Sequence, residues 1–208
     1  MPKGLSDMND KSAKIDIILA SASPRRREIL TSLGVNFRIV TSDADESCNE
    51  SDPGIRVERI AAAKCQAVID LLNQNVEMLD NSLIIAADTL VLANGCFLGK
   101  PQDREDASRM LSMLSGKTHS VISGIAVFFH GRTVTSHEMT HVTFAPMSSM
   151  DIESYITTGE PFGKAGAYAI QGHASRYIRG IEGDYFNVVG LPVHRLFDTV
   201  RGEFGIDL

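Results

Sequence analysis

The sequence predicts an α/β fold built on a mixed β-sheet. Apolar runs rich in branched residues alternate along the chain with segments whose apolar residues recur at helical spacing. Two long β-rich runs, at 119–129 and 132–144, are joined only by His130 and Gly131, so an antiparallel hairpin lies within the sheet. The 208 residues, of which 43% are hydrophobic, suffice for one domain or a compact two-lobed one.

The first half of the chain is expected to begin with a disordered leader. Residues 1–14 are polar, and the domain is expected to occupy 15–208, starting with a buried strand. Ser23 as N-cap and Pro24 as first helical residue begin a helix that ends at Gly34. The other elements expected in this half are strands at 15–20, 35–41 and 82–92, an acidic loop at 42–54 and a helix with one apolar stripe at 56–72.

In the second half, helix signals again alternate with strand signals. Asp103 caps a helix that is stopped by Gly116, and Ser148 begins a helix that ends at Gly159. The other elements expected here are a turn at 93–95 that leads to an apolar pair at 97–98, the hairpin, a glycine-rich loop at 163–172 that enters a strand, and a closing helix at 192–200.

The composition limits the class of ligand and the cell compartment. The formal charge of −6 argues against a nucleic-acid or membrane-surface partner, because both demand an excess of Lys and Arg. Cys48, Cys65 and Cys96 are too scattered for a disulfide framework, which favours a reducing environment. No signal peptide and no apolar run of about 18 residues is found, so a cytoplasmic protein that binds anions only locally is expected.

An H-E-x-x-H pattern from His137 to His141 suggests a zinc hydrolase. On a helix, this spacing places both imidazoles on one face for zinc. The surrounding residues alternate as in a strand, however, where residues four apart lie about 13 Å from each other, too far to share one ion. The context therefore favours a strand without zinc chemistry.

Two glycine–lysine segments resemble phosphate-binding P-loops. Residues 95–101 and 159–165 are each one residue too short between the glycines and lack the Ser or Thr that holds magnesium. Neither is a true P-loop. Lys100 and Lys164 can still meet phosphate singly, since each brings a mobile charge beside a glycine.

Three consecutive arginines, at 25–27, lie in the first turn of the first helix. A cation at this helix end is unfavourable by about 0.3–1 kcal/mol, and a bound anion relieves the conflict. A phosphate over residues 21–23 is the favoured interpretation. The alternative is that the arginines extend into water or pair with Asp43, Asp45 and Glu46 of the acidic loop.

Asp88 and Lys64 are polar residues in apolar surroundings. Asp88 lies within or at the end of an apolar strand, where it is a general base, a magnesium ligand or a cap of the next turn. Lys64 occupies the apolar stripe of its helix, so its ammonium either snorkels to water or faces a polar cleft. Several cations that converge around one carboxylate would form a polyphosphate site. Besides the arginines and Lys64, the candidate cations are Lys100, Lys117 and Lys164, each of which lies beside a glycine.

Five motifs in a fixed order resemble the Maf (septum-formation) family. They are LASASPRR at 19–26, ADT at 87–89, LGKP at 98–101, LSGKTH at 114–119 and KAGAYAIQG at 164–172. The resemblance implies a nucleoside triphosphate pyrophosphatase related in fold to the inosine triphosphate pyrophosphatases. It also implies a two-lobed α/β structure with an elongated mixed sheet and a central cleft, a homodimer, and a divalent cation, Mg²⁺ or Mn²⁺.

The resemblance also implies roles for individual residues. Asp88 would be the catalytic proton acceptor, and Glu46 would join it at the metal. The triphosphate would be lined by Ser21, Arg25, Arg26, Lys64, Lys100 and Lys164. Base specificity would depend on Arg25, Thr89 and Gln171, whose amide offers both a donor and an acceptor to a pyrimidine.

The motifs therefore predict hydrolysis of dTTP or UTP, and of some modified pyrimidine triphosphates, to the monophosphate and pyrophosphate. A non-catalytic nucleotide-binding regulator of cell division is the alternative. One departure from the family is Gly163, which replaces an Asp directly before Lys164.

Overall fold

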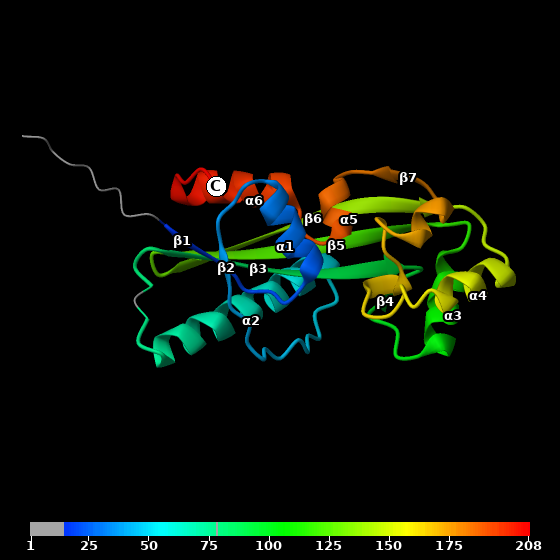
Figure 1. The fold of residues 1–208 in the computed structure, drawn as a ribbon, viewed down its shortest axis with the longest axis horizontal. Coiled ribbons are helices and arrows are strands. Elements are labelled where there is room, and N and C mark those ends of the chain that lie inside the picture. Colours follow the sequence, from blue (N-terminus) through cyan, green and yellow to red (C-terminus); the bar gives the residue numbers. More distant parts are fainter. Residues whose placement is uncertain (1–14, 78) are drawn as a thin grey trace, which may run out of the picture.

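A seven-stranded mixed sheet forms the centre of the part of the molecule that the computed structural model describes, residues 15–77 and 79–208 (Figure 1). The strand order is β2-β1-β3-β5-β6-β7, and β4 pairs with β3. Among the described strands, the pairs β1–β2 and β1–β3 are parallel and the other pairs are antiparallel. The strands are β1 (Asp16–Leu19), β2 (Arg38–Ile39), β3 (Ser82–Ala93), β4 (Cys96–Leu98), β5 (Thr118–Phe129), β6 (Arg132–Phe144) and β7 (Ile178–Glu182).

Helices cover both faces of this sheet. In Figure 1, α2 lies below the long strands, α1 and α6 lie above them, and α3 and α4 lie together at one end. The helices are α1 (Pro24–Ser32), α2 (Pro53–Gln74), α3 (Arg104–Leu114), α4 (Ser149–Thr157), α5 (Tyr185–Val189) and α6 (Val193–Phe204), with 3₁₀ turns η1 (Ala165–Ala167) and η2 (His173–Tyr177). The predicted α/β class with a mixed sheet is confirmed.

The core follows from the alternation of side chains along β3. Ile84 packs with Val68 of α2 on one face, whereas Ile85 packs with Leu30 of α1 and Leu196 of α6 on the other. Both faces of this strand are covered by helices, which explains why its sequence is almost continuously apolar.

Helix α2 lies unusually close to the sheet at Gly124. A Cβ at this glycine would lie 2.6 Å from the carbonyl carbon of Val57, so only glycine fits. Gly124 is also the register partner of Asp88 on β3. Lys64 follows Val57 by about two helical turns on the same face of α2, and this close approach therefore brings it over Asp88.

Several predicted boundaries are wrong. The strand expected at 35–41 is reduced to Arg38–Ile39, and α2 begins at Pro53 because the side chain of Asp52 accepts a hydrogen bond from the backbone N–H of Ile55. Helix α6 continues to Phe204, where Gly205 ends it in the left-handed region at φ 67°.

The glycine-rich loop at 163–172 leads into 3₁₀ turns rather than directly into a strand. The strand expected after this loop is β7, an almost wholly exposed edge strand that begins only at Ile178. Helix α5 was not predicted, because it is too short to show a helical period. The predicted leader at 1–14 lies outside the described residues. No helix within the described residues is both long and apolar enough to span a bilayer.

Candidate active site

A pocket of about 900 Å³ opens where α1, α2, β3 and the 163–171 loop meet. Every site residue that the family resemblance implies lines it; these are Ser21, Arg25, Arg26, Glu46, Lys64, Asp88, Thr89, Lys100, Lys164 and Gln171. Lys117, the remaining glycine-adjacent lysine, is not among the lining residues. The sequence therefore located the components of one pocket, although they come from distant segments.

Asp88 lies in the middle of β3, and its carboxylate meets a cation in the pocket. The Nζ of Lys64 is 2.7 Å from Oδ1 of Asp88 and 3.1 Å from Oε1 of Glu46. The side chain of Lys64 is 18% exposed and that of Asp88 is 15% exposed, so this pair is largely screened from water. Of the two alternatives for Lys64, the polar cleft is the one observed, and Asp88 is not a cap at a strand end.

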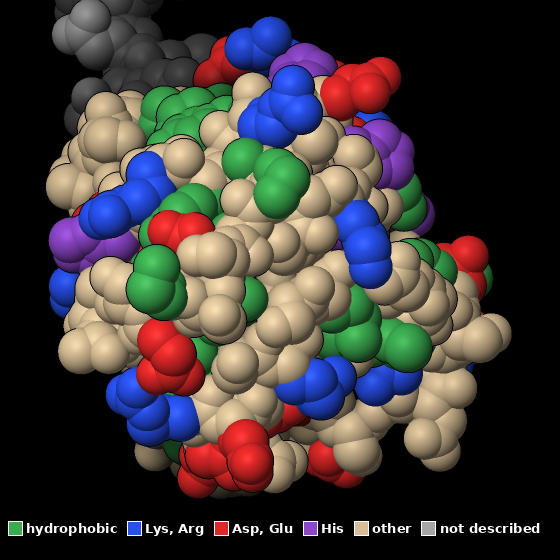
Figure 2. Space-filling model, turned by 90° about the vertical axis from the view of Figure 1, so that its right-hand side faces the viewer, with side chains coloured by type: hydrophobic (Ala, Val, Ile, Leu, Met, Phe, Trp, Pro, Cys, Tyr) green, Lys and Arg blue, Asp and Glu red, His purple; other side chains and the backbone are tan. Residues whose placement is uncertain are grey.

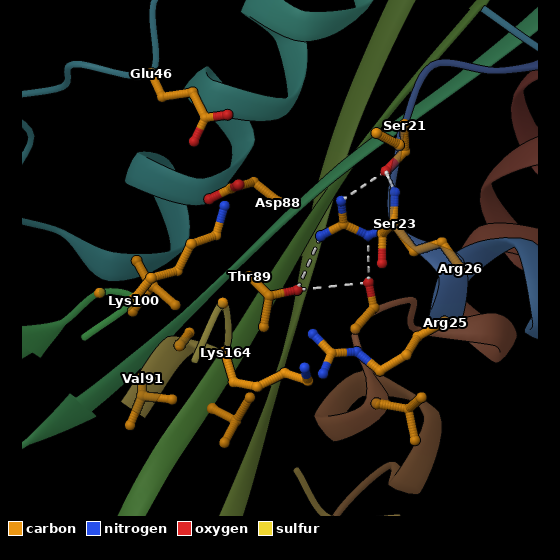
Figure 3. A pocket seen from close by; sticks show the side chains of 18 of the residues that line it. Ser21, Ser23, Arg25, Arg26, Glu46, Asp88, Thr89, Val91, Lys100 and Lys164 are labelled. Atoms are coloured by element: carbon orange, nitrogen blue, oxygen red, sulfur yellow. Dashed lines mark hydrogen bonds between the residues drawn. The ribbon is translucent and has the colours of Figure 1, made fainter. Parts of the chain in front are cut away.

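Arg26 is buried, and its guanidinium joins three segments of the pocket wall (Figure 3). Nε donates to the carbonyl oxygen of Gly190 at 2.8 Å, and the terminal nitrogens donate to Ser21 Oγ at 3.0 Å and to Thr89 Oγ1 at 3.2 Å. Burial lowers the pKa of Arg26, and the nearby carboxylate of Asp88 partly offsets this effect. Arg26 thus supplies a fixed positive charge beside Asp88.

Arg25 points into the same pocket, opposite Lys164 (Figure 3). Its Nε is buried and has no hydrogen-bond partner among the residues that the structure describes. Burial lowers the pKa of Lys164, and the charge of Arg25 lowers it further. Two facing cations with an unused donor form a site that a bound anion would stabilise. Arg27, by contrast, is exposed.

The face of the molecule at the α3 and α4 end carries charged side chains of both signs (Figure 2). On the face at the α3 and α4 end of the molecule, Lys and Arg side chains lie among Asp and Glu side chains without forming a broad cationic surface (Figure 2). This mixture of signs agrees with the formal charge of −6.

Sequence reasoning missed some of the lining residues. The guanidinium carbon of Arg56, in the first turns of α2, lies 4.9 Å from the ring centre of Phe97 on β4, and both residues line the pocket. Gly190 was also missed, although its carbonyl accepts the hydrogen bond from Arg26. Neither residue belongs to one of the five motifs, so only the three-dimensional arrangement reveals them.

The H-E-x-x-H pattern lies on strand β6, as its context predicted. Nδ1 of His137 is 2.6 Å from Oε1 of Glu58, and Nδ1 of His141 is 3.1 Å from Oγ of Ser120. The two imidazoles therefore bond to different partners along the strand. Within the described residues, no group of three or more His, Cys, Asp or Glu side chains is arranged to hold a metal ion by itself.

Comparison with known proteins adds a family and a fold. The model of the family described as "Maf-like protein" matches residues 16–203. A dTTP/UTP pyrophosphatase of Pelotomaculum thermopropionicum is 45% identical over 196 residues, which cover 93% of this chain and 98% of that protein. A dTTP/UTP pyrophosphatase of Desulforamulus reducens is 46% identical over 195 residues, covering 92% and 98%, respectively.

A solved structure supports the architecture alone. The Ham1 protein of Staphylococcus aureus superposes with a TM-score of 0.51 at 13% sequence identity, and the match covers 90% of this chain and 99% of that chain. At this identity the likeness concerns the fold and not the ligand. It agrees with the layered α/β arrangement of Figure 1.

Proposed function

The chain belongs to the Maf family, and from this premise we propose that it is a nucleoside triphosphate pyrophosphatase that hydrolyses dTTP and UTP. The products are the nucleoside monophosphate and pyrophosphate. The identities of 45% and 46% to two dTTP/UTP pyrophosphatases, over more than nine-tenths of the chain, support the reaction and the substrate.

The observation that carries the proposal is the pairing of one carboxylate with a ring of cations in a single pocket. Asp88 is the carboxylate, and the pocket adds Arg25, Arg26, Lys64, Lys100 and Lys164. A triphosphate carries about four negative charges, so it requires a site of this composition. The chain as a whole carries a formal charge of −6, so these cations form a local excess in an acidic protein.

The donor set also fits a divalent cation, Mg²⁺ or Mn²⁺. Asp88 and Glu46 both contact the same ammonium of Lys64, so their carboxylates converge on one cationic position. Magnesium is typically held by one or two carboxylates together with substrate phosphates and water, and it does not require a larger protein cage. When bound, the cation would neutralise charge on the phosphate oxygens.

In the proposed reaction, Asp88 is the proton acceptor. It takes a proton from a water molecule whose oxygen forms a bond to the α-phosphorus. The bond from that phosphorus to the bridging oxygen breaks, and pyrophosphate leaves with the electron pair. The cations of Arg25, Arg26 and Lys164 stabilise the charge that develops on the leaving group.

The base would be read by Gln171, Arg25 and Thr89, which line the same pocket. The amide of Gln171 offers a hydrogen-bond donor and an acceptor to the pyrimidine edge. Arg25 and Thr89 are the other two proposed specificity residues. Thr89 is itself fixed, since its hydroxyl lies 2.8 Å from Ser123 Oγ and accepts a hydrogen bond from Arg26.

The test is a nucleotide panel assayed for pyrophosphate release with Mg²⁺ or Mn²⁺, using wild type, Asp88→Asn and the control Asp198→Asn. Asp198 is an exposed carboxylate of α6 that does not line the pocket. We expect wild type and Asp198→Asn to hydrolyse dTTP and UTP. Asp88→Asn should bind dTTP but lose turnover by about 10²–10⁴-fold, the typical contribution of a general base.

Two results would contradict the proposal. Orthophosphate as the first product would place the cleavage at the wrong phosphorus. Binding of dTTP by the wild type for hours with metal present, and without pyrophosphate release, would indicate a nucleotide-binding regulator in place of an enzyme.

A further inference from the structure

Glu160 lies just outside the pocket and holds the segment that carries Gln171. It follows α4, and its carboxylate accepts hydrogen bonds from the backbone N–H of His173 at 2.8 Å and from that of Ala174 at 3.3 Å. These two N–H groups directly follow Gly172. One side of the Gln171 segment is therefore anchored to this carboxylate.

The other side of the segment is anchored through Tyr155, a buried residue of α4. The Tyr155 hydroxyl donates to Oε1 of Glu160 at 2.8 Å and accepts from the backbone N–H of Ala169 at 3.3 Å. Burial and then the hydrogen bond to Glu160 raise the pKa of this phenol, so it remains a donor. Tyr155 and Glu160 thus form one hydrogen-bonded unit with both ends of the segment at 169–174.

The backbone between these anchors is tightly fitted. A Cβ on Gly172 would overlap with the carboxylate of Glu160. The carboxylate thus packs directly against the residue that follows Gln171. Gln171 is exposed and lines the pocket, so its amide direction depends on this anchored backbone.

The Glu160 carboxylate is suited to this role by its charge. Burial raises its pKa, but the N–H of His173, the hydroxyl of Tyr155 and the N–H of Ala174 together lower it below the ordinary value. It therefore stays ionised and accepts three hydrogen bonds at once. Charge-assisted bonds of this kind are roughly twice as strong as neutral ones.

We propose that Glu160, acting with Tyr155, is a positioning residue for base selection, because it fixes the backbone on both sides of Gln171. The inference rests on the proposed function, since it assigns Gln171 to the pyrimidine. Glu160 itself does not touch the substrate. Its contribution is to hold the Gln171 amide in place before the nucleotide binds, which spares the cost of ordering the loop.

The test compares kcat/KM for dTTP and dCTP in wild type, Glu160→Gln, Gln171→Ala and the double variant. Glutamine keeps the size of Glu160, but its NH₂ group cannot accept the hydrogen bonds that both carboxylate oxygens now accept. We expect Glu160→Gln to reduce the dTTP/dCTP selectivity by about tenfold, as a loop displacement of less than 1 Å would. Glu153→Gln, on the exposed face of α4, is the matched control and should leave selectivity unchanged.

The double variant separates positioning from general destabilisation. If Glu160 acts through Gln171, adding Glu160→Gln to Gln171→Ala causes no further loss of selectivity. An equal further loss in the double variant, or unchanged selectivity in Glu160→Gln, would overturn the inference.

Tyr155→Phe provides a second route if Glu160→Gln does not fold. It removes the hydroxyl between Glu160 and Ala169 but keeps the buried ring, and it should also lower the dTTP/dCTP selectivity. Unchanged selectivity in a folded Tyr155→Phe would count against the inference. If wild type releases no pyrophosphate from any nucleotide, the proposed function fails instead, whatever the variants do.

Discussion

The ammonium of Lys64 lies 2.7 Å from Oδ1 of Asp88, and this contact joins the helix on one face of the sheet to its central strand. Both side chains are mostly withdrawn from water. Lys64 also contacts Glu46 of the acidic loop at 3.1 Å. One ammonium therefore contacts both carboxylates of the proposed mechanism, the proton acceptor Asp88 and the metal ligand Glu46.

Replacing Lys64 by glutamine should lower kcat/KM for dTTP by about 10²–10³-fold, the usual cost of removing one preorganised charge from a transition state. The charge on the phosphate oxygens would be less stabilised, and the carboxylate of Asp88 would lose its nearest cation. Pyrophosphate release under single-turnover conditions is the measurement. Lys117→Gln is the control, because Lys117 is also a lysine beside a glycine but lies outside the pocket lining; equal losses in both variants would contradict the assignment.

Much of this pocket could be predicted because several of its residues are charged side chains in unfavourable sequence surroundings. Asp88 is a carboxylate in an apolar run, and Arg25 and Arg26 are cations at the unfavourable end of a helix. Such local conflicts indicate function without knowledge of the fold. The motif resemblance then connected segments that the spacing alone could not bring together.

What the sequence did not reveal depends on contacts between distant segments. Glu160 is an ordinary acidic residue in a loop, and its two partners at 173–174 are backbone N–H groups, which leave no trace in side-chain patterns. The bounds of strand β7 were not predicted, because it has no buried face to impose an alternating pattern. Helix α2 begins at Pro53 because the side chain of Asp52 caps it. In the sequence, Asp52 looks like one more acidic residue of the loop expected at 42–54.

Gly124→Ala should destabilise the fold by about 1–3 kcal/mol, the range for overpacking a core. The new methyl group would meet backbone atoms of Val57 and Glu58 at 2.6–2.7 Å, and backbone cannot move aside as a flexible side chain can. Urea unfolding checks this value. The control is Gly180→Ala, where no atom lies within 4 Å of the new Cβ, and it should change stability by no more than about 0.5 kcal/mol.

The same substitution should also affect the site. Gly124 is opposite Asp88 in the sheet, and it sets the distance of α2, which carries Lys64. We therefore expect Gly124→Ala to reduce pyrophosphate release even at a temperature where the variant is fully folded. Full activity in a destabilised variant would show that the close approach of α2 serves stability alone.

Stability should fall as the pH falls from 6.5 toward 4, because of His119. This imidazole is buried, its Nε2 lies 2.8 Å from the hydroxyl of Tyr168, and burial lowers its pKa to about 4. Between these pH values the unfolded chain binds a proton that the folded chain excludes, so the stability that His119 contributes at neutral pH is lost on acidification. The full loss below pH 4 is about 3 kcal/mol.

Urea unfolding at a series of pH values measures this slope in wild type, His119→Gln and His194→Gln. Glutamine can still donate a hydrogen bond to Tyr168 but does not titrate, so His119→Gln should flatten the dependence between pH 4 and 6.5, whatever its stability at neutral pH. His194 is exposed on α6, and its replacement should leave the slope as in wild type. An unchanged slope in His119→Gln would assign the acid sensitivity to the carboxylates instead.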